Sequence, residues 1–155
     1  MELSLSSESP CFIRYANCSQ TVSEDAYSDD GFILYDKESL SKALCFIVTY
    51  GRLYSEALLA KGALAAFDIS CSVIALEQLL PLSYPLEALK EVLEAADPRA
   101  PLLFAEEGVL HGGLSEALTG ALIKEGCLSE RKYIIKAVRT PCKSIKSTDA
   151  ILYPL

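Results

Sequence analysis

From Gly31 onward, short runs of apolar residues alternate with longer segments in which apolar residues recur at helical spacing. A short apolar run bounded by turn residues is typical of a strand buried on both faces, because such a strand loses the inside–outside alternation. The runs predict strands over about Phe32–Tyr35, Leu44–Tyr50, Ile69–Leu76, Pro101–Glu106 and Tyr133–Val138.

Three segments between these runs predict amphipathic helices. The first follows Gly51 and ends near Asp68, and the second spans Pro85–Ala96 with Ser83 as its N-cap. The third spans Gly113–Gly126 and has the most regular helical spacing in the chain. Its apolar stripe consists of Leu114, Ala117, Leu118, Ala121 and Leu122.

Buried strands that alternate with helices imply an α/β fold, in which a mostly parallel sheet is covered on both faces. The first thirty residues differ, because they are polar and acidic around one short strand-like stretch, Cys11–Tyr15. The sequence therefore divides into a tail or linker over residues 1–30 and a regular α/β domain over residues 31–155.

Composition agrees with a single ordinary domain. The chain has 155 residues, of which 51% are hydrophobic and 23% charged, so wholesale disorder is excluded. It contains no run of about 18 apolar residues, and its first residues lack the basic and apolar regions of a secretory signal. We expect a cytoplasmic protein with no membrane contact.

Charge is unevenly distributed along the chain. Residues 1–123 carry 7 basic and 18 acidic side chains, whereas residues 124–155 carry 7 basic and 3 acidic ones. The acidic balance argues against a nucleic-acid partner, which requires a basic surface. The basic end is interpreted as a solvated edge, with contact to a phosphorylated ligand or an acidic partner as the alternative.

Most signatures of catalysis and metal binding are missing. The six cysteines form no Cys-x-x-Cys pair, and His111 is the only histidine, so no tetrahedral zinc site is expected. No dinucleotide-binding, phosphate-loop or nucleophile-elbow motif occurs. Cys45 and Cys71 lie inside apolar runs and are interpreted as small buried residues in a reducing compartment, not as half-disulfides.

Two places carry candidate chemistry. Glu106 and Glu107 end the fourth predicted strand, where adjacent side chains point to opposite faces and cannot form a facing acid–base pair. We expect one of them to brace the Gly108–Gly113 turn through backbone N–H groups. Arg14 lies in the short apolar stretch of the acidic segment, where it could bind a phosphate or carboxylate, or equally pair with a local aspartate.

In their order and spacing, three stretches resemble the C-terminal domain of transketolase-type thiamine-diphosphate enzymes: CFIVTYGRLYSEALLAKGAL, FDISCSVIALEQLLPL and PLLFAEEGVLHGGLSEALTGAL. The most specific marker is Glu106-Glu107-Gly108 followed by Gly112-Gly113, which the resemblance assigns to a structural turn. It implies a three-layer α/β/α fold with a mixed five-stranded sheet in the order 1-3-2-4-5, strand 1 being antiparallel. The similarity covers about Gly31–Val138.

The stretch Pro10–Tyr15 is similar to the end of the pyrimidine-binding domain in the 1-deoxy-D-xylulose-5-phosphate synthase family. The resemblance implies an enzyme that uses thiamine diphosphate and magnesium to join pyruvate and glyceraldehyde 3-phosphate with loss of carbon dioxide, for isoprenoid precursor and thiamine biosynthesis. It places Arg14 on the substrate phosphate. The family's second arginine is replaced by Asn17.

The resemblance also implies what the chain lacks. The diphosphate- and magnesium-binding domain and nearly all of the pyrimidine-binding domain of the family are absent, so residues 1–30 correspond to the end of that domain and its linker. We therefore expect no catalytic or metal-binding residue here, no cofactor held by the fragment, an inactive isolated chain, and a homo-oligomer that needs the missing domains as partners. Another transketolase-like enzyme, such as a transketolase or a 2-oxoacid dehydrogenase beta subunit, and a stand-alone α/β binding module remain the alternatives.

Overall fold

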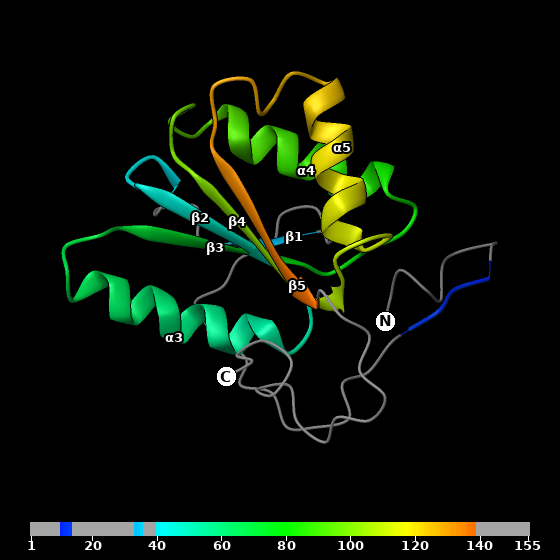
Figure 1. Cartoon of the computed structure of the whole chain (residues 1–155), viewed down its shortest axis with the longest axis horizontal. Coiled ribbons are helices and arrows are strands. Elements are labelled where there is room, and N and C mark those ends of the chain that lie inside the picture. The colour runs from blue at the N-terminus through cyan, green and yellow to red at the C-terminus, as the bar shows by residue number, and fades with distance from the viewer. Residues whose placement is uncertain (1–9, 14–32, 36–39, 139–155) are drawn as a thin grey trace.

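The computed structural model describes residues 10–13, 33–35 and 40–138. Eight elements follow one another along them (Figure 1). In chain order they are β1 (Ile33–Tyr35), β2 (Cys45–Thr49), α3 (Leu53–Ala65), β3 (Cys71–Leu76), α4 (Ser83–Glu94), β4 (Leu102–Val109), α5 (Leu114–Lys124) and β5 (Tyr133–Val138).

The strands form one sheet in the order β1-β3-β2-β4-β5. Strands β3, β2, β4 and β5 are parallel, while the short β1 pairs antiparallel with β3 at the edge of the sheet. The four parallel strands and three helices confirm the α/β fold expected from the alternating sequence pattern.

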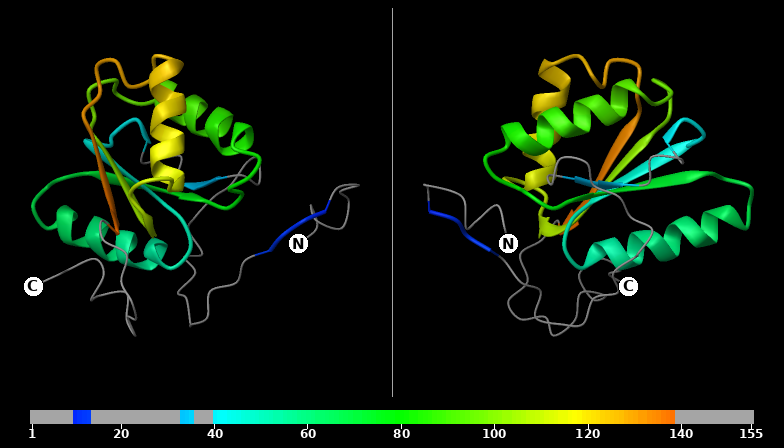
Figure 2. Two further views of the ribbon diagram at one scale, coloured as in Figure 1. Left: turned by 45° about the vertical axis from the view of Figure 1, so that its right-hand side comes forward. Right: turned by 180° about the vertical axis from the view of Figure 1, so that it is seen from behind.

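The helices lie on both faces of the sheet. Helix α3 covers one face, and α4 and α5 cover the other (Figure 1, Figure 2). The larger core lies under α4 and α5 and includes Phe46, Leu89 and Phe104, each at most 1% exposed. A smaller core under α3 is formed by Ile47, Ala57, Cys71 and Val73. Each large apolar side chain buried in this way contributes about 1.5–3 kcal/mol to stability.

Four expectations about the elements need correction. Helix α4 begins at Ser83, so this residue is not the N-cap; Leu82 holds that position with helical φ and ψ and no side-chain cap. The backbone N–H groups in the first turn of a helix have no partner within the helix, so proline is tolerated at any position there. Pro85 is therefore the third residue of α4 and does not mark its start. Strand β4 continues to Val109 instead of ending at Glu106, because an irregularity between Ala105 and Val109 lets it pair with β5 again.

The third correction concerns the buried side of α5. The apolar stripe predicts Ala117 and Ala121 in the core, but Ala117 is exposed and Ala121 is only partly buried. The buried residues are instead Ser115, Leu118, Thr119 and Leu122. The strand-like stretch Cys11–Tyr15 shows no strand over Cys11–Ile13, and its last two residues lie outside the described ones.

Candidate functional site

The candidate site lies where β4 ends and α5 begins, at the carboxyl edge of the parallel strands. This is the edge at which open parallel sheets usually present functional groups. Four of the residues singled out in the sequence meet there: Glu106 and Glu107 on β4, Gly112 in the turn, and Gly113 as the N-cap of α5.

Glu106 is a fully buried carboxylate, with 0% of the residue exposed. Its Oε2 accepts hydrogen bonds from the backbone N–H of Ser115 at 2.8 Å and from the Ser115 hydroxyl at 2.9 Å. The first of these satisfies one of the unpaired N–H groups at the start of α5, and the helix dipole favours a negative charge at that end. The carboxylate therefore acts as a remote cap that ties β4 to α5.

The buried hydroxyls of α5 continue this network. Thr119 Oγ1 donates to the backbone oxygen of Ser115 at 2.8 Å, one helical turn away. The hydrogen bonds to Glu106 hold Ser115 on the inner side of α5, and Thr119 lies one turn further along the same side. These two residues are buried there in place of the predicted Ala117 and Ala121. The sequence pattern did not indicate Ser115 and Thr119. Their only signal was two hydroxyl residues at i, i+4, the first of them two positions after Gly113.

The two glycines of the turn serve different purposes. Gly112 has φ +79°, a conformation that favours glycine, and its N–H donates to Glu116 Oε2 at 2.6 Å. At Gly113, an added methyl group would overlap Glu106 Oε1 and the backbone oxygen of Val109. Glycine at position 113 is therefore required for space, since it lets the turn close over the buried carboxylate.

Glu107 points away from Glu106, as expected for neighbours on a strand. Its Oε1 lies 3.1 Å from Nε of Arg52, which precedes α3 on the other side of the sheet. The two carboxylates thus serve separate contacts, one to α5 and one to the β2–α3 connection. A facing acid–base pair is not formed.

His111 does not organise a reactive centre. Its side chain is 84% exposed, and Nδ1 lies 3.6 Å from Glu116 Oε1. The hydrogen bond from Gly112, followed by the contact with His111, lowers the pKa of Glu116 below its usual value of 4.5. These contacts stabilise the turn.

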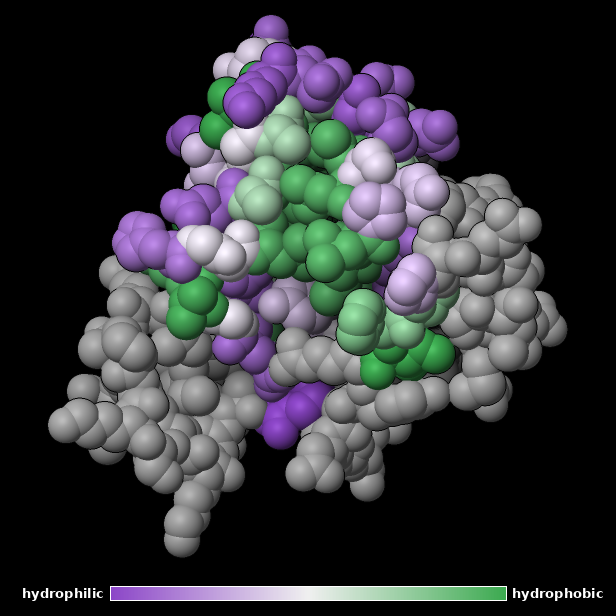
Figure 3. Space-filling model, turned by 90° about the vertical axis from the view of Figure 1, so that its right-hand side faces the viewer, coloured by the Kyte–Doolittle hydropathy of each residue, from purple (hydrophilic) through white to green (hydrophobic). Residues whose placement is uncertain are grey.

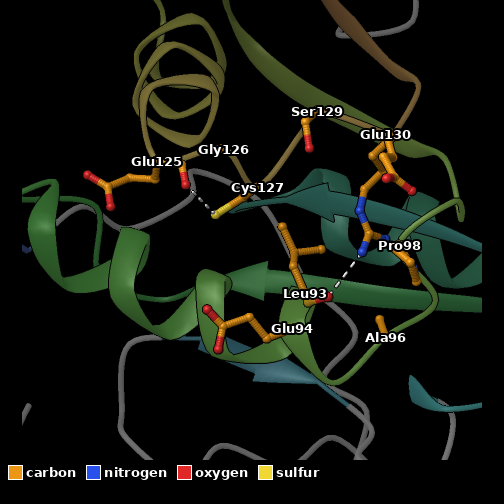
Figure 4. A pocket seen from close by; sticks show the side chains of 10 residues that line it. Leu93, Glu94, Ala96, Pro98, Glu125, Gly126, Cys127, Ser129 and Glu130 are labelled. Carbon is orange, nitrogen blue, oxygen red and sulfur yellow. Dashed lines mark hydrogen bonds between the residues drawn. The ribbon is translucent and has the colours of Figure 1, made fainter.

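A shallow pocket of about 460 Å³ opens at the opposite, amino edge of the sheet. The carboxylates of Glu94, Glu125 and Glu130 line it (Figure 4). Beside them, Arg131 is 6% exposed and donates from Nη1 to the Ala100 oxygen at 3.1 Å and from Nη2 to the Leu93 oxygen at 3.0 Å.

Arg131 also packs over Phe46, with its Cζ 5.9 Å from the ring centre. Burial lowers the pKa of Arg131 from its usual value. Leu93 lies in the last turn of α4, where backbone oxygens lack partners within the helix. The guanidinium of Arg131 therefore caps this end of the helix and holds the segment before β5 against it. No local pattern around position 131 predicts a buried arginine.

Arg14, the candidate phosphate ligand, lies outside the described residues. Within the described ranges, no three His, Cys, Asp or Glu side chains are grouped so that they could hold a metal ion. The helices described are too short or too polar to cross a membrane.

Known proteins resemble this chain in fold. No family model matches it, and no curated protein matches it. Among solved structures, it matches a chain named "Split gene transketolase, inactive beta4 tetramer" with a TM-score of 0.63 and 23% sequence identity. The fold is one that a transketolase shares.

The extent of this match matters for its interpretation. It covers 86% of the present chain but only 40% of the transketolase chain. At this level of sequence identity, the likeness shows a shared fold. The present chain thus spans less than half the length of that transketolase subunit, which was itself solved as an inactive tetramer.

Proposed function

We propose that this chain is the C-terminal domain of a thiamine-diphosphate-dependent enzyme of the transketolase class, and more narrowly of a 1-deoxy-D-xylulose-5-phosphate synthase. That enzyme condenses pyruvate with glyceraldehyde 3-phosphate and releases carbon dioxide. The fold shared with a transketolase supports the class. The narrower assignment is supported by the similarity of Pro10–Tyr15 to the synthase family.

The observation that carries the proposal is the turn at the end of β4, set in this fold. The motif Glu106-Glu107-Gly108 with Gly112-Gly113, which the sequence resemblance singled out, folds into one unit in which a buried carboxylate caps α5. A structural role for these residues fits a domain that supports an active site contributed by other domains.

The described residues do not fit a thiamine diphosphate and magnesium site. Magnesium takes oxygen ligands from carboxylates and phosphates, but Glu106 faces Ser115 and Glu107 faces Arg52. In this proposal the cofactor and its metal are held by the diphosphate- and pyrimidine-binding domains of the whole enzyme.

The surface offers a place for those domains to bind. Figure 3 views the molecule from the side of the β3–α4 connection, and apolar surface gathers in the middle of this face. Leu80 is 73% exposed in that connection, Tyr84 is 45% exposed at the start of α4, and Val109 is 48% exposed at the end of β4. These three residues follow or end strands at the carboxyl edge of the sheet. Exposed apolar groups on one side of a molecule are typical of an interaction surface, which supports the proposal.

Reconstitution tests the proposal. The purified full chain is mixed with a polypeptide that carries the two missing thiamine domains, together with thiamine diphosphate, magnesium, pyruvate and glyceraldehyde 3-phosphate. We expect 1-deoxyxylulose 5-phosphate from the mixture and none from either component alone. Product from the chain alone, or a mixture that neither associates nor reacts, would contradict the proposal.

A transketolase is the second candidate, because the matched structure bears that name. The same mixture distinguishes the two when it is supplied with a ketose phosphate as two-carbon donor in place of pyruvate. Transfer from the ketose, without release of carbon dioxide from pyruvate, would identify a transketolase.

Arg14→Ala and Arg14→Lys then test the role of the arginine in the reconstituted enzyme. KM for the aldehyde phosphate should rise about tenfold or more with Ala and less with Lys, while KM for pyruvate stays unchanged.

A further inference from the structure

Two cysteines that are far apart in the sequence open neighbouring strands. Cys45 is the first residue of β2 and Cys71 the first of β3, and the parallel register places them directly opposite each other. Both contribute to the small core under α3. Adjacent strands are about 4.8 Å apart, and a disulfide requires Cα atoms separated by about 4.4–6.8 Å. The backbone spacing therefore suits a bridge between them.

The hydrogen bonds of the two thiols show that they lie close together. Cys45 Sγ donates to the backbone oxygen of Ser70, the residue directly before Cys71, at 4.0 Å. The same oxygen accepts the N–H of Leu44 at 2.8 Å, which fixes the start of β2 against the start of β3. Burial and then the charge and side-chain hydrogen bond of Cys45 raise the pKa of Cys71 to about 12.

The two sites differ in access to solvent. Cys71 is 3% exposed, whereas Cys45 is only partly buried. An oxidant from solvent therefore reaches Cys45 first, and the buried neighbour is in position to react next.

We propose that Cys45 and Cys71 form a reversible redox site, at which hydrogen peroxide converts the two thiols into an intrachain disulfide. The Cys45 thiolate attacks one peroxide oxygen, which breaks the O–O bond and gives a sulfenic acid and water once the leaving hydroxide takes a proton. The sulfur of Cys71 then attacks the sulfenic sulfur, its proton leaves with the departing hydroxyl as a second water, and the S–S bond forms. Two thiols are oxidised and one peroxide is reduced.

The bridge would act at a defined place in the fold. It would join β2 to β3 at their first residues and enclose α3 in the loop between the two cysteines. This is the amino edge of the sheet, away from the Glu106 turn and the exposed apolar residues of the carboxyl edge. The redox site is therefore independent of the proposed enzyme class.

The test uses the full chain with serine at the other four cysteine positions, so that only the pair is left. Substituted residues are Cys11, Cys18, Cys127 and Cys142. After treatment with hydrogen peroxide, the intact mass should fall by two hydrogen atoms per chain, and a tryptic peptide linking Cys45 to Cys71 should appear. Dithiothreitol should reverse both changes, and the oxidised form should unfold at a higher urea concentration than the reduced form.

Two matched variants control for chance oxidation. Adding Cys71→Ser to the same background should abolish the mass loss and leave Cys45 to gain oxygen atoms instead. Cys45→Ser should slow all oxidation, because only the buried thiol remains. Circular dichroism checks that each variant is folded. A folded pair variant that gains only oxygen atoms, resists oxidation, or links between chains instead of within one would overturn the proposal.

Discussion

Glu106 and Ser115 are joined by two hydrogen bonds to a single carboxylate oxygen, one from the backbone and one from the hydroxyl. The other oxygen, Oε1, is buried against Gly113 and has no hydrogen-bond partner among the described residues. The carboxylate is thus anchored on one side and enclosed on the other. This relationship makes the turn sensitive to small changes.

Removing the carboxylate should destabilise the domain. Glu106→Ala removes both hydrogen bonds and the negative charge at the start of α5, and we expect the free energy of unfolding to fall by about 2–4 kcal/mol. Glu106→Gln keeps one oxygen that can accept from Ser115, so its loss should be smaller. Urea unfolding followed by circular dichroism measures both, and equal stability of Glu106→Ala and the wild type would refute the capping role.

Gly113 and Gly120 provide a matched pair for testing the packing of the turn. Gly113→Ala should cost about 1–3 kcal/mol, because the new methyl group must displace Glu106 or the Val109 carbonyl. Gly120 lies within α5 with open space around it, so Gly120→Ala should raise stability by about 0.5–1 kcal/mol through helix propensity. If both variants shift the unfolding midpoint in the same direction, the steric account is wrong.

Arg131 should stabilise the amino edge through its buried hydrogen bonds. Arg131→Ala leaves the carbonyls of Leu93 and Ala100 without this donor and removes packing on Phe46, so we expect a loss of about 2–4 kcal/mol. The exposed Arg99 offers a control, because Arg99→Ala should change stability by less than about 0.5 kcal/mol. Chemical denaturation of the two variants under identical conditions compares them.

The turn should also respond to pH through Glu116. Since its pKa is lowered in the folded chain, its contribution is complete above the ordinary value of 4.5 and is lost as the pH falls through the folded-state pKa. An NMR titration should show a Glu116 carboxyl midpoint below 4.5 and a parallel shift of the Gly112 amide. In Glu116→Gln the Gly112 shift should vanish, and its persistence would mean that another group titrates there.

The exposed apolar residues of the carboxyl edge should cause the isolated chain to self-associate. We expect the weight-average mass in light scattering to rise with concentration, and Leu80→Asp combined with Val109→Asp should reduce this rise. Leu59 on α3 is similarly exposed at 69%, and Leu59→Asp should have little effect. A monomeric mass at all concentrations would count against this surface.

The sequence pattern was sufficient for the elements but not for their contacts. Buried strands and helices repeat with different periods, so the runs around β2, β3 and β5 predicted strands close to those described. Ser115 is buried because it bonds to Glu106, nine residues earlier in the chain. The spacing of apolar residues within one helix gives no information about such a contact. Likewise, the pairing of Cys45 with Cys71 follows from strand order, and alternation alone does not specify that order.

Strand β4 buries alternate residues, and Glu106 is the third in the row after Leu102 and Phe104. A single residue inserted or deleted between Phe104 and Glu106 would therefore exchange the directions of Glu106 and Glu107. The first glutamate would then point toward Arg52, and the second would be driven beneath α5. The number of residues between the apolar core and the paired glutamates therefore decides which glutamate faces α5. Substitutions leave this number unchanged, so only an insertion or a deletion can test it.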